Sequence, residues 1–567
     1  MKKMTISSIC VAALALLFSC TGNNEFLKED PKGMVTTENL MSNTDNMQLM
    51  INGLYWIWQR AMTRPYESPE CKQNSSDDRL GLPPVREEDG QCETNSPISA
   101  AGDGYITKGW ERCWNVINQA NSIINNAKEE EDGDNSKLHE LVGQAHFIRA
   151  YTYLYLVRYF NNIPLVTTAY DPDKDRSLTV SPSSDIYELI VEDLKKAEEW
   201  LPLKYDDSLL SNGGSVTRAA AKALLAKVYL QRAGFPCNGG NADYKLAMDK
   251  AKELIDNAGT YGLGLYDHYY QIWDPYWKPN THQGKEEVLL FIACDGTDDG
   301  YSVRSPNPSR PADDPFNGWY LFQSELYFFI YFPEGERKDF TFVTDYYYTE
   351  GGEVKHKTWQ ELQTGHPMYR KWWADDLTEG WTWDENGPGG NWLNNMNACA
   401  TWYNGRDIIM LRYADVLLTY AEAQCRVDGS PNALAYDCLN QVRNRAKAGV
   451  GTTSESLSGL SADQFLDTVV WERAYEFAGG EFESRWFDLI RLELVEKATT
   501  TADSAGPMMP YPPSMSKGWR YEPSDVIPAL SMLELQRSYT KHDYFLEIPT
   551  SDATLNPNLK DNNANLR

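Results

Sequence analysis

Basic residues are scarce in this sequence. Lysine and arginine together number 53 against 81 aspartates and glutamates, which gives a formal net charge of −28 at pH 7. A body this acidic repels nucleic acid and anionic lipid, because proteins bind both through basic patches that neutralise phosphate. The sequence therefore predicts no nucleic-acid partner.

Long apolar runs and closely spaced cysteines are also lacking. After the N-terminus no run reaches about eighteen apolar residues, so we expect no membrane-spanning helix. The ten cysteines contain no C-x-x-C pair, which argues against a zinc ribbon or a thioredoxin-like redox centre. Cys71, Cys92 and Cys113 are candidates for disulfide pairing, but the sequence leaves their connectivity open.

Metal-binding and catalytic motifs are missing as well. The seven histidines form no H-E-x-x-H motif, and His139 and His146 fit better as core or surface residues of a helix. Asp295, Asp298 and Asp299 are weak calcium candidates, because the spacing of an EF-hand is absent. Neither a phosphate-binding glycine loop nor a G-x-S-x-G turn occurs. We therefore expect no metal and no cofactor.

The N-terminus instead reads as a targeting segment. Two lysines precede an apolar run that is too short to span a bilayer. The sequence L-F-S-C, which ends at Cys20, resembles the lipobox of bacterial lipoproteins, in which the cysteine becomes the lipidated first residue. We therefore assign 1–19 to a lipoprotein signal peptide and 20–37 to a tether. Several acyl chains on Cys20 would anchor the protein to a membrane.

The central stretch Gln144–Val166 predicts a buried helix. From Ala145 to Phe160 it is apolar or aromatic nearly all round, which is typical of a helix that other helices cover. Arg149 and Arg158 interrupt this pattern on opposite sides. Asparagines and a proline then end the helix, so we expect a helical scaffold around it.

Other segments repeat the helical pattern, and several have recognisable caps. Thr217 is a predicted cap, Ser183 or Ser184 another, Ser430 with Pro431 a third, and Ser461 with Gln464 forms a capping box. Alanine lies where neighbouring helices would touch, as in tetratricopeptide-like pairs, although the strict 34-residue signature is absent. The predicted helices cover 38–60, a segment starting at Trp110, 185–201, 218–232, 244–255, 411–427, 433–446 and 462–477.

Two regions lack this periodicity. Residues 62–99 form a long proline-rich loop, and such loops are often functional. Residues 266–403 form an aromatic-rich irregular region with ten of the 18 tryptophans. The pattern predicts a short buried strand or a turn of the core at Glu287–Ala293 and another strand at Phe340–Thr349. We therefore predict a mainly α fold with a large loop-rich insertion, flanked by an N-terminal helical scaffold over 38–265 and a C-terminal helical part over 404–567.

Several stretches together resemble the SusD/RagB family, the surface glycan-binding lipoproteins of the Bacteroidota. Each stretch alone is a helix-packing pattern, but jointly they follow the family order over most of the mature chain. The stretches are the lipobox Cys20, Phe26–Pro31, QAHFIRAYTYLYLVRYFNNIPLV from Gln144, TRAAAKALLAKVYLQRAG from Thr217, YRKW from Tyr369, RYADVLLTYAEAQ from Arg412, Leu439–Ala446, WERAYEFAGG from Trp471, RWFDLIR from Arg485 and LEIPTSDATLNPNLKDN from Leu546.

This resemblance implies a SusD-like fold and a binding function. Members of the family lie as a lid on a SusC-like TonB-dependent transporter in the outer membrane, capture oligosaccharide at the cell surface and pass it to the pore. The family places the tetratricopeptide-like helices toward the transporter and the ligand on loops. We therefore expect an oligosaccharide or polysaccharide ligand, a transporter partner and a lipid-anchored, outward-facing location.

Sugar binding needs flat apolar faces for the ring and polar groups for the hydroxyls. The irregular regions supply both, and so many aromatics without periodicity are hard to bury together. Further candidates of second rank are Trp372, Trp373, Trp381, Trp383 and Trp392. The predicted contact residues are Trp273, Tyr276, Trp277, Trp319 and Tyr320, with Asp77, Asp78, Arg79 and Asn95 from the early loop.

Three alternatives remain open at this point. Any single tryptophan in these regions could be an ordinary core residue. A glycoside hydrolase would need two opposed carboxylates, for which Asp375, Asp376, Asp384 and Glu385 are available, although adjacent acids in so acidic a chain are ordinarily solvated. The same scaffold could also bind a peptide or another non-glycan nutrient.

Overall fold

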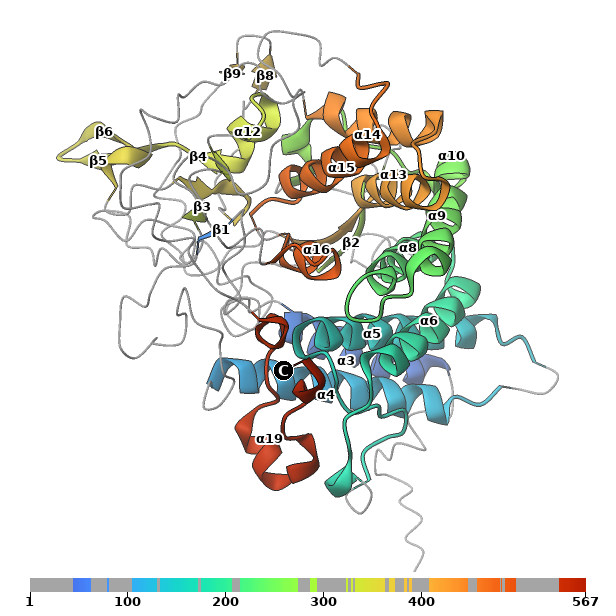
Figure 1. Ribbon diagram of the computed structural model, residues 1–567. Helices are drawn as coiled ribbons and strands as arrows, with labels where there is room; N and C mark the ends of the chain where they lie inside the picture. Colours follow the sequence, from blue (N-terminus) through green and yellow to red (C-terminus); the bar gives the residue numbers. More distant parts are fainter. Residues whose placement is uncertain are drawn as a thin grey trace, which may run out of the picture.

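Long helices dominate the computed structural model of the chain (Figure 1), which confirms the mainly α prediction. Among the described helices, none is both long and apolar enough to cross a bilayer. The structure describes residues 44–62, 79–80, 104–129, 133–171, 175–205, 215–273, 286–292, 323–324, 328–329, 332–362, 367–372, 382–384, 387–389, 407–446, 456–479, 481, 485–495 and 540–566.

The elements follow the sequence in this order. The α-helices are α3 (Thr44–Met62), α4 (Gly104–Asn126), α5 (Ser136–Phe160), α6 (Ser183–Trp200), α8 (Arg218–Ala233), α9 (Gly240–Asp256), α10 (Ala258–Tyr261), α12 (Glu336–Thr341), α13 (Tyr413–Asp428), α14 (Ala433–Arg445), α15 (Ala462–Glu476), α16 (Arg485–Arg491) and α19 (Thr550–Leu555). The strands are β1 (Arg79–Leu80), β2 (Val288–Ile292), β3 (Gln323–Ser324), β4 (Phe342–Val343), β5 (Asp345–Glu350), β6 (Glu353–Thr358), β7 (Met368–Tyr369), β8 (Thr382–Asp384), β9 (Gly387–Gly389) and β10 (Ile408–Arg412). The 3₁₀ turns used below are η4 (Asp175–Ser177), η5 (Tyr269–Trp273), η7 (Trp359–Glu361) and η8 (Arg370–Trp372).

Helix α5 lies at the centre of the helical part, as its sequence predicts. Nearly every residue from Leu141 to Phe160 is buried, and α5 packs against α3, α4 and α6. Arg149 and Arg158 are buried too, so each needs a partner inside the protein. Arg149 binds Asp193 of α6 with Nη2 to Oδ1 at 2.7 Å, and Arg158 lies over the ring of Phe487.

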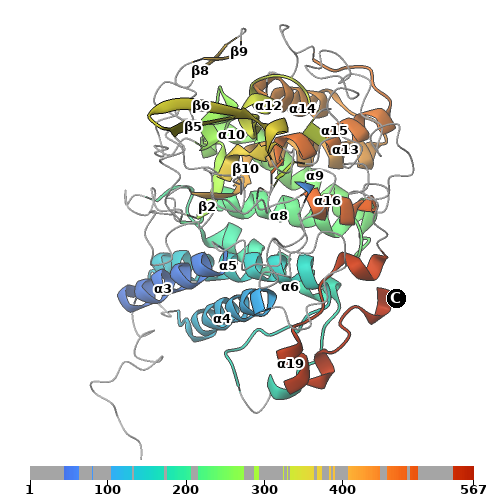
Figure 2. The same ribbon diagram turned by 90° about the vertical axis from the view of Figure 1, so that its left-hand side faces the viewer.

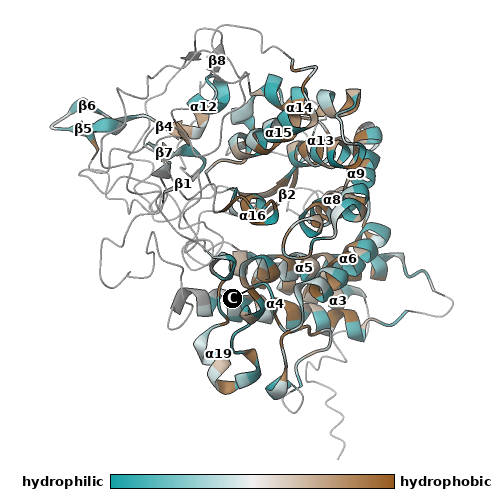
Figure 3. Ribbon diagram, in the orientation of Figure 1, coloured by the Kyte–Doolittle hydropathy of each residue, from teal (hydrophilic) through white to brown (hydrophobic). Residues whose placement is uncertain are grey.

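Successive helices pack beside one another from α3 to α9, and α9 then packs against α13. Figures 1 and 2 show α3 to α6 in the lower half and α8, α9 and α13 to α15 above them. Figure 3 shows teal and brown side by side along helices such as α6 and α9, as expected of amphipathic helices. In α8 the residues Ala219, Ala220 and Ala223 are buried, so small side chains do lie at the contacts between the tetratricopeptide-like pairs.

Two of the predicted helix caps are confirmed. The Thr217 side chain accepts a hydrogen bond from Ala220 N at 3.3 Å. Ser461 and Gln464 form the reciprocal capping box, with Ser461 Oγ accepting from Gln464 N and Gln464 Oε1 accepting from Ser461 N. Both caps satisfy backbone N–H groups that have no partner within the first helical turn.

The other two caps are wrong. Ser183 is the first residue of α6 rather than its cap, and its N–H donates to Asn162 Oδ1 at 3.1 Å. Helix α14 is capped by Asn432 and not by Ser430, because Asn432 Oδ1 accepts from Ala435 N at 2.8 Å. Serine, threonine and asparagine are nearly equivalent as caps, so neighbouring candidates cannot be ranked by residue type alone.

The strand predicted at Glu287–Ala293 is confirmed as β2. It pairs antiparallel with β10, whose last two residues were predicted to begin a helix. All five residues of β10 are buried. A short apolar run of this kind gives the same pattern in a buried strand and in a buried helix, which explains the error.

The strand predicted at Phe340–Thr349 is divided in the structure. Phe340 and Thr341 end α12, and β4 and β5 follow, separated by Thr344. Strand β5 pairs with β6 in a hairpin whose turn contains Gly351 and Gly352 at positive φ. Helical and extended residues share the same apolar character here, so the boundary is set by tertiary contacts rather than by local pattern.

The C-terminal segment returns to the end of α5. Leu546 N donates to Tyr159 O at 2.7 Å, and Asn562 Nδ2 donates to Phe160 O at 2.5 Å. The same Asn562 accepts from Ile548 N at 3.3 Å through its Oδ1. These bonds satisfy carbonyl groups in the last turn of α5 that a helix leaves without an internal partner.

Candidate functional site

A four-stranded sheet joins the early loop to the aromatic-rich region. Its strand order is β1-β3-β7-β4, with Arg79 opposite Ser324 and Leu80 opposite Gln323. Strand β3 in turn pairs with β7 at Gln323 and Met368. The chain thus brings segments that are more than two hundred residues apart in sequence into one sheet, and Arg79, a predicted contact residue, lies in its edge strand β1.

Most of the predicted contact residues lie outside the described residues. Trp273 is described in full, and the backbones are described of Arg79 in β1, Trp372 in η8, and Trp383 and Asp384 in β8. The candidates outside the described residues are Asp77, Asp78, Asn95, Tyr276, Trp277, Trp319, Tyr320, Trp373, Trp381, Trp392, Asp295, Asp298, Asp299, Asp375, Asp376 and Glu385.

Trp273 differs from the expectation of an open aromatic face. It is 6% exposed and belongs to a buried cluster with Tyr269 and Phe340. Phe340 stacks on its ring at 5.4 Å between centroids, and Lys371 Nζ lies 4.6 Å from the ring centroid. Both neighbours occupy surface that a sugar would need, so Trp273 is a core residue of the framework.

Other described aromatic residues of the middle region form a second core cluster. Phe328, Phe329, Phe342 and Trp359 pack with residues of α15, including Tyr475. Their rings meet mostly edge to face, as in the pair Phe329–Trp359 at 5.6 Å. The argument that so many aromatics cannot be buried together is therefore wrong for this part, because α15 supplies the opposing surface.

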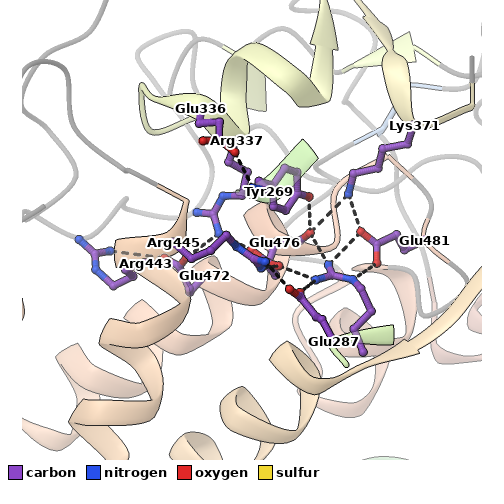
Figure 4. A network of polar contacts seen from close by, with 11 residues as sticks. Tyr269, Glu287, Glu336, Arg337, Lys371, Arg443, Arg445, Glu472, Glu476 and Glu481 are labelled. Carbon is purple, nitrogen blue, oxygen red and sulfur yellow. Dashed lines mark hydrogen bonds and ion pairs between the residues drawn. The ribbon is translucent and has the colours of Figure 1, made fainter. Parts of the chain in front are cut away.

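Beneath these aromatics lies a buried set of ion pairs, which we call the central ion-pair network. Its centre is Arg412, whose Nη1 binds Glu476 Oε1 at 2.6 Å and Glu287 Oε1 at 2.9 Å. Arg412 Nε also binds Glu481 Oε2 at 2.9 Å. The network comprises Glu287, Arg337, Lys371, Arg412, Arg443, Arg445, Glu472, Glu476 and Glu481 (Figure 4).

Every carboxylate of this network contacts at least one cation. Arg445 binds both Glu287 and Glu476 at 2.5 Å, and Arg337 Nη1 binds Glu472 at 2.6 Å and Glu476 at 2.8 Å. Arg443 Nη1 also lies 3.4 Å from Glu472 Oε2. Five cations therefore face four carboxylates, and all nine side chains are buried. Burying one such charge without its partners is costly, so the network holds together only as a set.

The electrostatic environment fixes the protonation states in the network. Burial alone would raise the pKa of Glu476, but the guanidinium groups of Arg445, Arg412 and Arg337 outweigh it and hold that pKa well below its usual range. Burial lowers the pKa of Lys371 to about 8, against the opposing effect of the Glu481 carboxylate. Glu476 is thus a fixed negative charge rather than a proton donor, and its role is structural.

A second ion-pair network links α8, α13, α15 and α16. Lys227 and Arg473 both bind Asp415, the latter at 2.6 Å, and Arg473 Nε also binds Asp488 Oδ2 at 2.8 Å. Arg491 pairs with Glu422 through two bonds of 2.7 Å.

Cations lower the pKa of the buried carboxyls in this second network. Burial would raise the pKa of Asp415, but Lys227 and Arg473 lower it to about 2. Burial would likewise raise the pKa of Glu422, and Arg491 with Arg426 lowers it to about 2. Both carboxyls are therefore ionised in the folded protein at neutral pH.

The histidine and cysteine candidates have structural surroundings. His146 is buried with Nδ1 2.6 Å from Asp193 Oδ1, and His139 stacks on Trp200 at 4.6 Å, as expected of core and surface residues. The disulfide prediction is wrong for Cys113, which is a free, buried thiol, while Cys71 and Cys92 lie outside the described residues. Within the described part of the chain, no group of three or more His, Cys, Asp or Glu could hold a metal ion.

Two family models match the chain on either side of its centre. The model described as "SusD family" matches residues 317–565. A SusD-like model described as "Starch-binding associating with outer membrane" matches residues 25–230. The chain belongs to the SusD family.

Relatives of this SusD family member span nearly the whole chain. A SusD-like protein P2 of Formosa agariphila is 28% identical over 87% of this chain and 91% of its own length. A SusD homolog of Bacteroides thetaiotaomicron has a TM-score of 0.67 and 22% identity, and covers 92% of this chain and 97% of the homolog. These values support the SusD-like fold, in agreement with the resemblance drawn from the motifs.

Two further solved structures of this fold are described with a sugar. One is a laminarin-binding SusD-like protein with a TM-score of 0.60 and 20% identity, covering 90% of this chain and 97% of that protein. The other is a structure with xylogluco-oligosaccharide, with a TM-score of 0.62 and 20% identity, covering 91% of this chain and 98% of that protein.

Sequence reasoning missed both ion-pair networks of this SusD family member. The signal was present in RYADVLLTYAEAQ, where Asp415 and Glu422 interrupt a helix that is otherwise apolar nearly all round and Arg412 directly precedes it. A charge in such a helix is buried and needs a partner of opposite charge. The partners could not be named, because they come from distant segments such as α15 and α16.

Replacing the central arginine tests the first network. The substitution Arg412→Met leaves the carboxylates of Glu287, Glu476 and Glu481 short of a cation, so we expect the free energy of unfolding to fall by about 3–5 kcal/mol. Urea denaturation followed by circular dichroism measures it. The control Lys252→Met removes a surface pair with Asp256 on α9 and should change stability little. Equal stability of R412M and the wild type would contradict this role.

The second network predicts how stability depends on pH. The folded pKa of Glu422 lies below the ordinary value of 4.5, so its ionised carboxyl stabilises the fold above pH 4.5 and loses this effect as the pH falls toward about 2. In Glu422→Gln, the pH slope of the free energy of unfolding should decrease by up to about 1.4 kcal/mol per pH unit in this range. Urea titrations at several pH values measure the slope, with the exposed Asp249→Asn as control. An unchanged slope in E422Q would refute the assignment.

Proposed function

We propose that this protein is a cell-surface glycan-binding lipoprotein. It captures an oligosaccharide at the outer membrane and passes it to a SusC-like TonB-dependent transporter. The observation that carries the proposal is the pairing of β1 with β3, because it joins the early loop to the aromatic-rich region in one sheet. Membership of the SusD family and the sugar ligands of two structurally similar proteins support it further.

The proposed sugar site lies around the β1–β3 pair. Asp77 and Asp78 immediately precede Arg79 in the sequence, and Trp319 and Tyr320 come shortly before Gln323. Aromatic rings would cover the C–H face of a sugar, and carboxylates with the guanidinium would bind its hydroxyls. Tyr276, Trp277 and Asn95 remain proposed contacts, whereas Trp273 is buried in the core and is no longer one of them.

This proposal describes binding and not bond cleavage. The buried carboxylates of the two ion-pair networks are held by arginine or lysine, so they act as structural charges. Retaining and inverting glycosidases instead need a protonated carboxyl opposite an ionised one. Incubation of the purified protein with the glycan it binds should release no new reducing ends.

Loss of binding on removal of the aromatic pair tests the site. We expect affinity electrophoresis against plant, host and microbial glycans to identify a glycan that slows the migration of the full chain through the gel. The double variant Trp319→Ala and Tyr320→Ala should weaken that binding about tenfold or more, since each aromatic contact contributes about 0.5–1.5 kcal/mol beyond its buried area.

Two controls define the result. Tyr170→Ala removes an aromatic residue that is 63% exposed but far from the sheet in sequence and should leave the retardation unchanged. Trp273→Phe keeps an aromatic ring in the core and should also retain binding. If no glycan retards the protein and a peptide library contains a peptide that it binds, the proposed ligand is a peptide rather than a glycan.

Lipid anchoring and transporter contact form the second part of the proposal. In cells given radioactive palmitate, the wild-type chain should be labelled and remain with the outer membrane, whereas Cys20→Ala should be unlabelled and released. Protease added to intact cells should degrade the anchored chain if it faces the exterior. A TonB-dependent transporter should copurify with the wild-type chain from membranes solubilised in mild detergent. Labelling of the C20A variant would rule out Cys20 as the lipidation site.

A further inference from the structure

The outer side of helix α3 is nearly free of charge in a strongly acidic protein. Its 19 residues include one acidic residue, Asp45, and one basic residue, Arg60. Helix α6 differs, since most of its exposed residues are charged: Asp185, Glu188, Glu192, Lys195, Lys196 and Glu199. A surface that avoids charge in so acidic a protein is typical of a protein interface.

Large apolar side chains lie on this outer side. Leu49 is 62% exposed and Trp56 is 43% exposed, and between them lie the exposed residues Asn52 and Gly53. With spacings of three, four and seven, these residues share one helical face with Asp45 and Arg60. We call this set the α3 face: Asp45, Leu49, Asn52, Gly53, Trp56 and Arg60.

The inner side of α3 is buried against the rest of the protein. Met47, Ile51, Leu54 and Trp58 are buried, and the helix packs with them against α4 and α5. Figure 2 shows α3 at the margin of the lower helices. The α3 face therefore points away from the body of the protein.

The α3 face has a symmetric order of residues. Counted from the point between Asn52 and Gly53, Leu49 and Trp56 are equally distant, and so are Asp45 and Arg60. Each residue adds about 1.5 Å along a helix axis. If two antiparallel copies cross at this point, each residue lies opposite the residue of the second copy that is equally far from the point on its other side. Leu49 would then meet Trp56 of the second copy, and Asp45 would meet Arg60 of the second copy.

The centre of the α3 face also suits a close approach. A Cβ added to Gly53 would meet no heavy atom within 4 Å, so the surface has an open notch there. The guanidinium of Arg60 lies 4.7 Å from the centroid of the Trp56 ring, which holds both side chains in place on the face. An ordered face loses less conformational entropy when a partner binds it.

We propose that the α3 face is a self-association surface on which a second copy of this chain binds antiparallel about a twofold axis. A twofold interface must be complementary to itself, and the pairing of Leu49 with Trp56 and of Asp45 with Arg60 meets this condition. One helix from each copy buries less than a standard interface of about 1,600 Å², so the dimer is weak. A lipid surface or an unrelated partner would have no need for opposite charges at symmetric positions.

Disulfide trapping in the intact membrane tests the contact. Asn52→Cys in the full chain places a thiol beside the proposed axis, and mild oxidation of cells should give a dimer on a non-reducing gel. Two controls are used. The wild-type chain shows how much dimer its natural cysteines form, and Lys196→Cys places a thiol on the charged face of α6. No dimer from a folded N52C variant, or an equal dimer from either control, would overturn the proposal.

Exchanging the charges of Asp45 and Arg60 distinguishes self-association from the binding of another partner to the α3 face. In the N52C background, Asp45→Arg or Arg60→Asp alone should reduce the trapped dimer on the order of tenfold, because each change creates two like-charge contacts across the axis. The double variant D45R/R60D exchanges the two charges and should restore the dimer. If the double variant yields as little trapped dimer as the single variants, the antiparallel pairing is wrong. A different partner, such as the transporter, then covers this face.

Discussion

The ion pairs around Arg412 hold together parts of the protein that lie far apart in its sequence. Strand β10 provides the arginine, the residue before β2 provides Glu287, and the end of α15 provides Glu476. Hydrophobic burial alone would allow these elements to slide against one another, since apolar contacts are not directional. Short bonds between buried charges have defined geometry, so they fix how the sheet region sits on the helices.

Local features of the fold were predictable because they depend on neighbouring residues. The amphipathic pattern gave α9, the apolar run gave α5, and a capping box at Ser461 gave the start of α15. Errors occurred where residues outside the segment decide the outcome. The last two residues of strand β10 read as helix because burial on all sides removes the alternation that marks a strand, and only the pairing with β2 distinguishes the two.

The candidate site was predictable in composition and not in arrangement. An excess of tryptophan in an irregular region indicates either a sugar surface or an unusual core, and Trp273 shows that at least part of it is core. The pattern could not reveal that α15 supplies an apolar surface for these rings, because that contact spans more than a hundred residues. Nor could it reveal that Arg79 would enter a strand opposite Ser324, since pairing between short distant strands leaves no periodic signal.

The contact between the C-terminal segment and the end of α5 has a consequence for the order of folding. Asn562 completes the hydrogen bonding of a helix that ends at Phe160, about four hundred residues earlier. A ribosome releases the chain from its N-terminus, so the central helix cannot reach its final state until synthesis is nearly finished. The unfinished chain therefore keeps the end of its central helix incompletely bonded until the last residues are made.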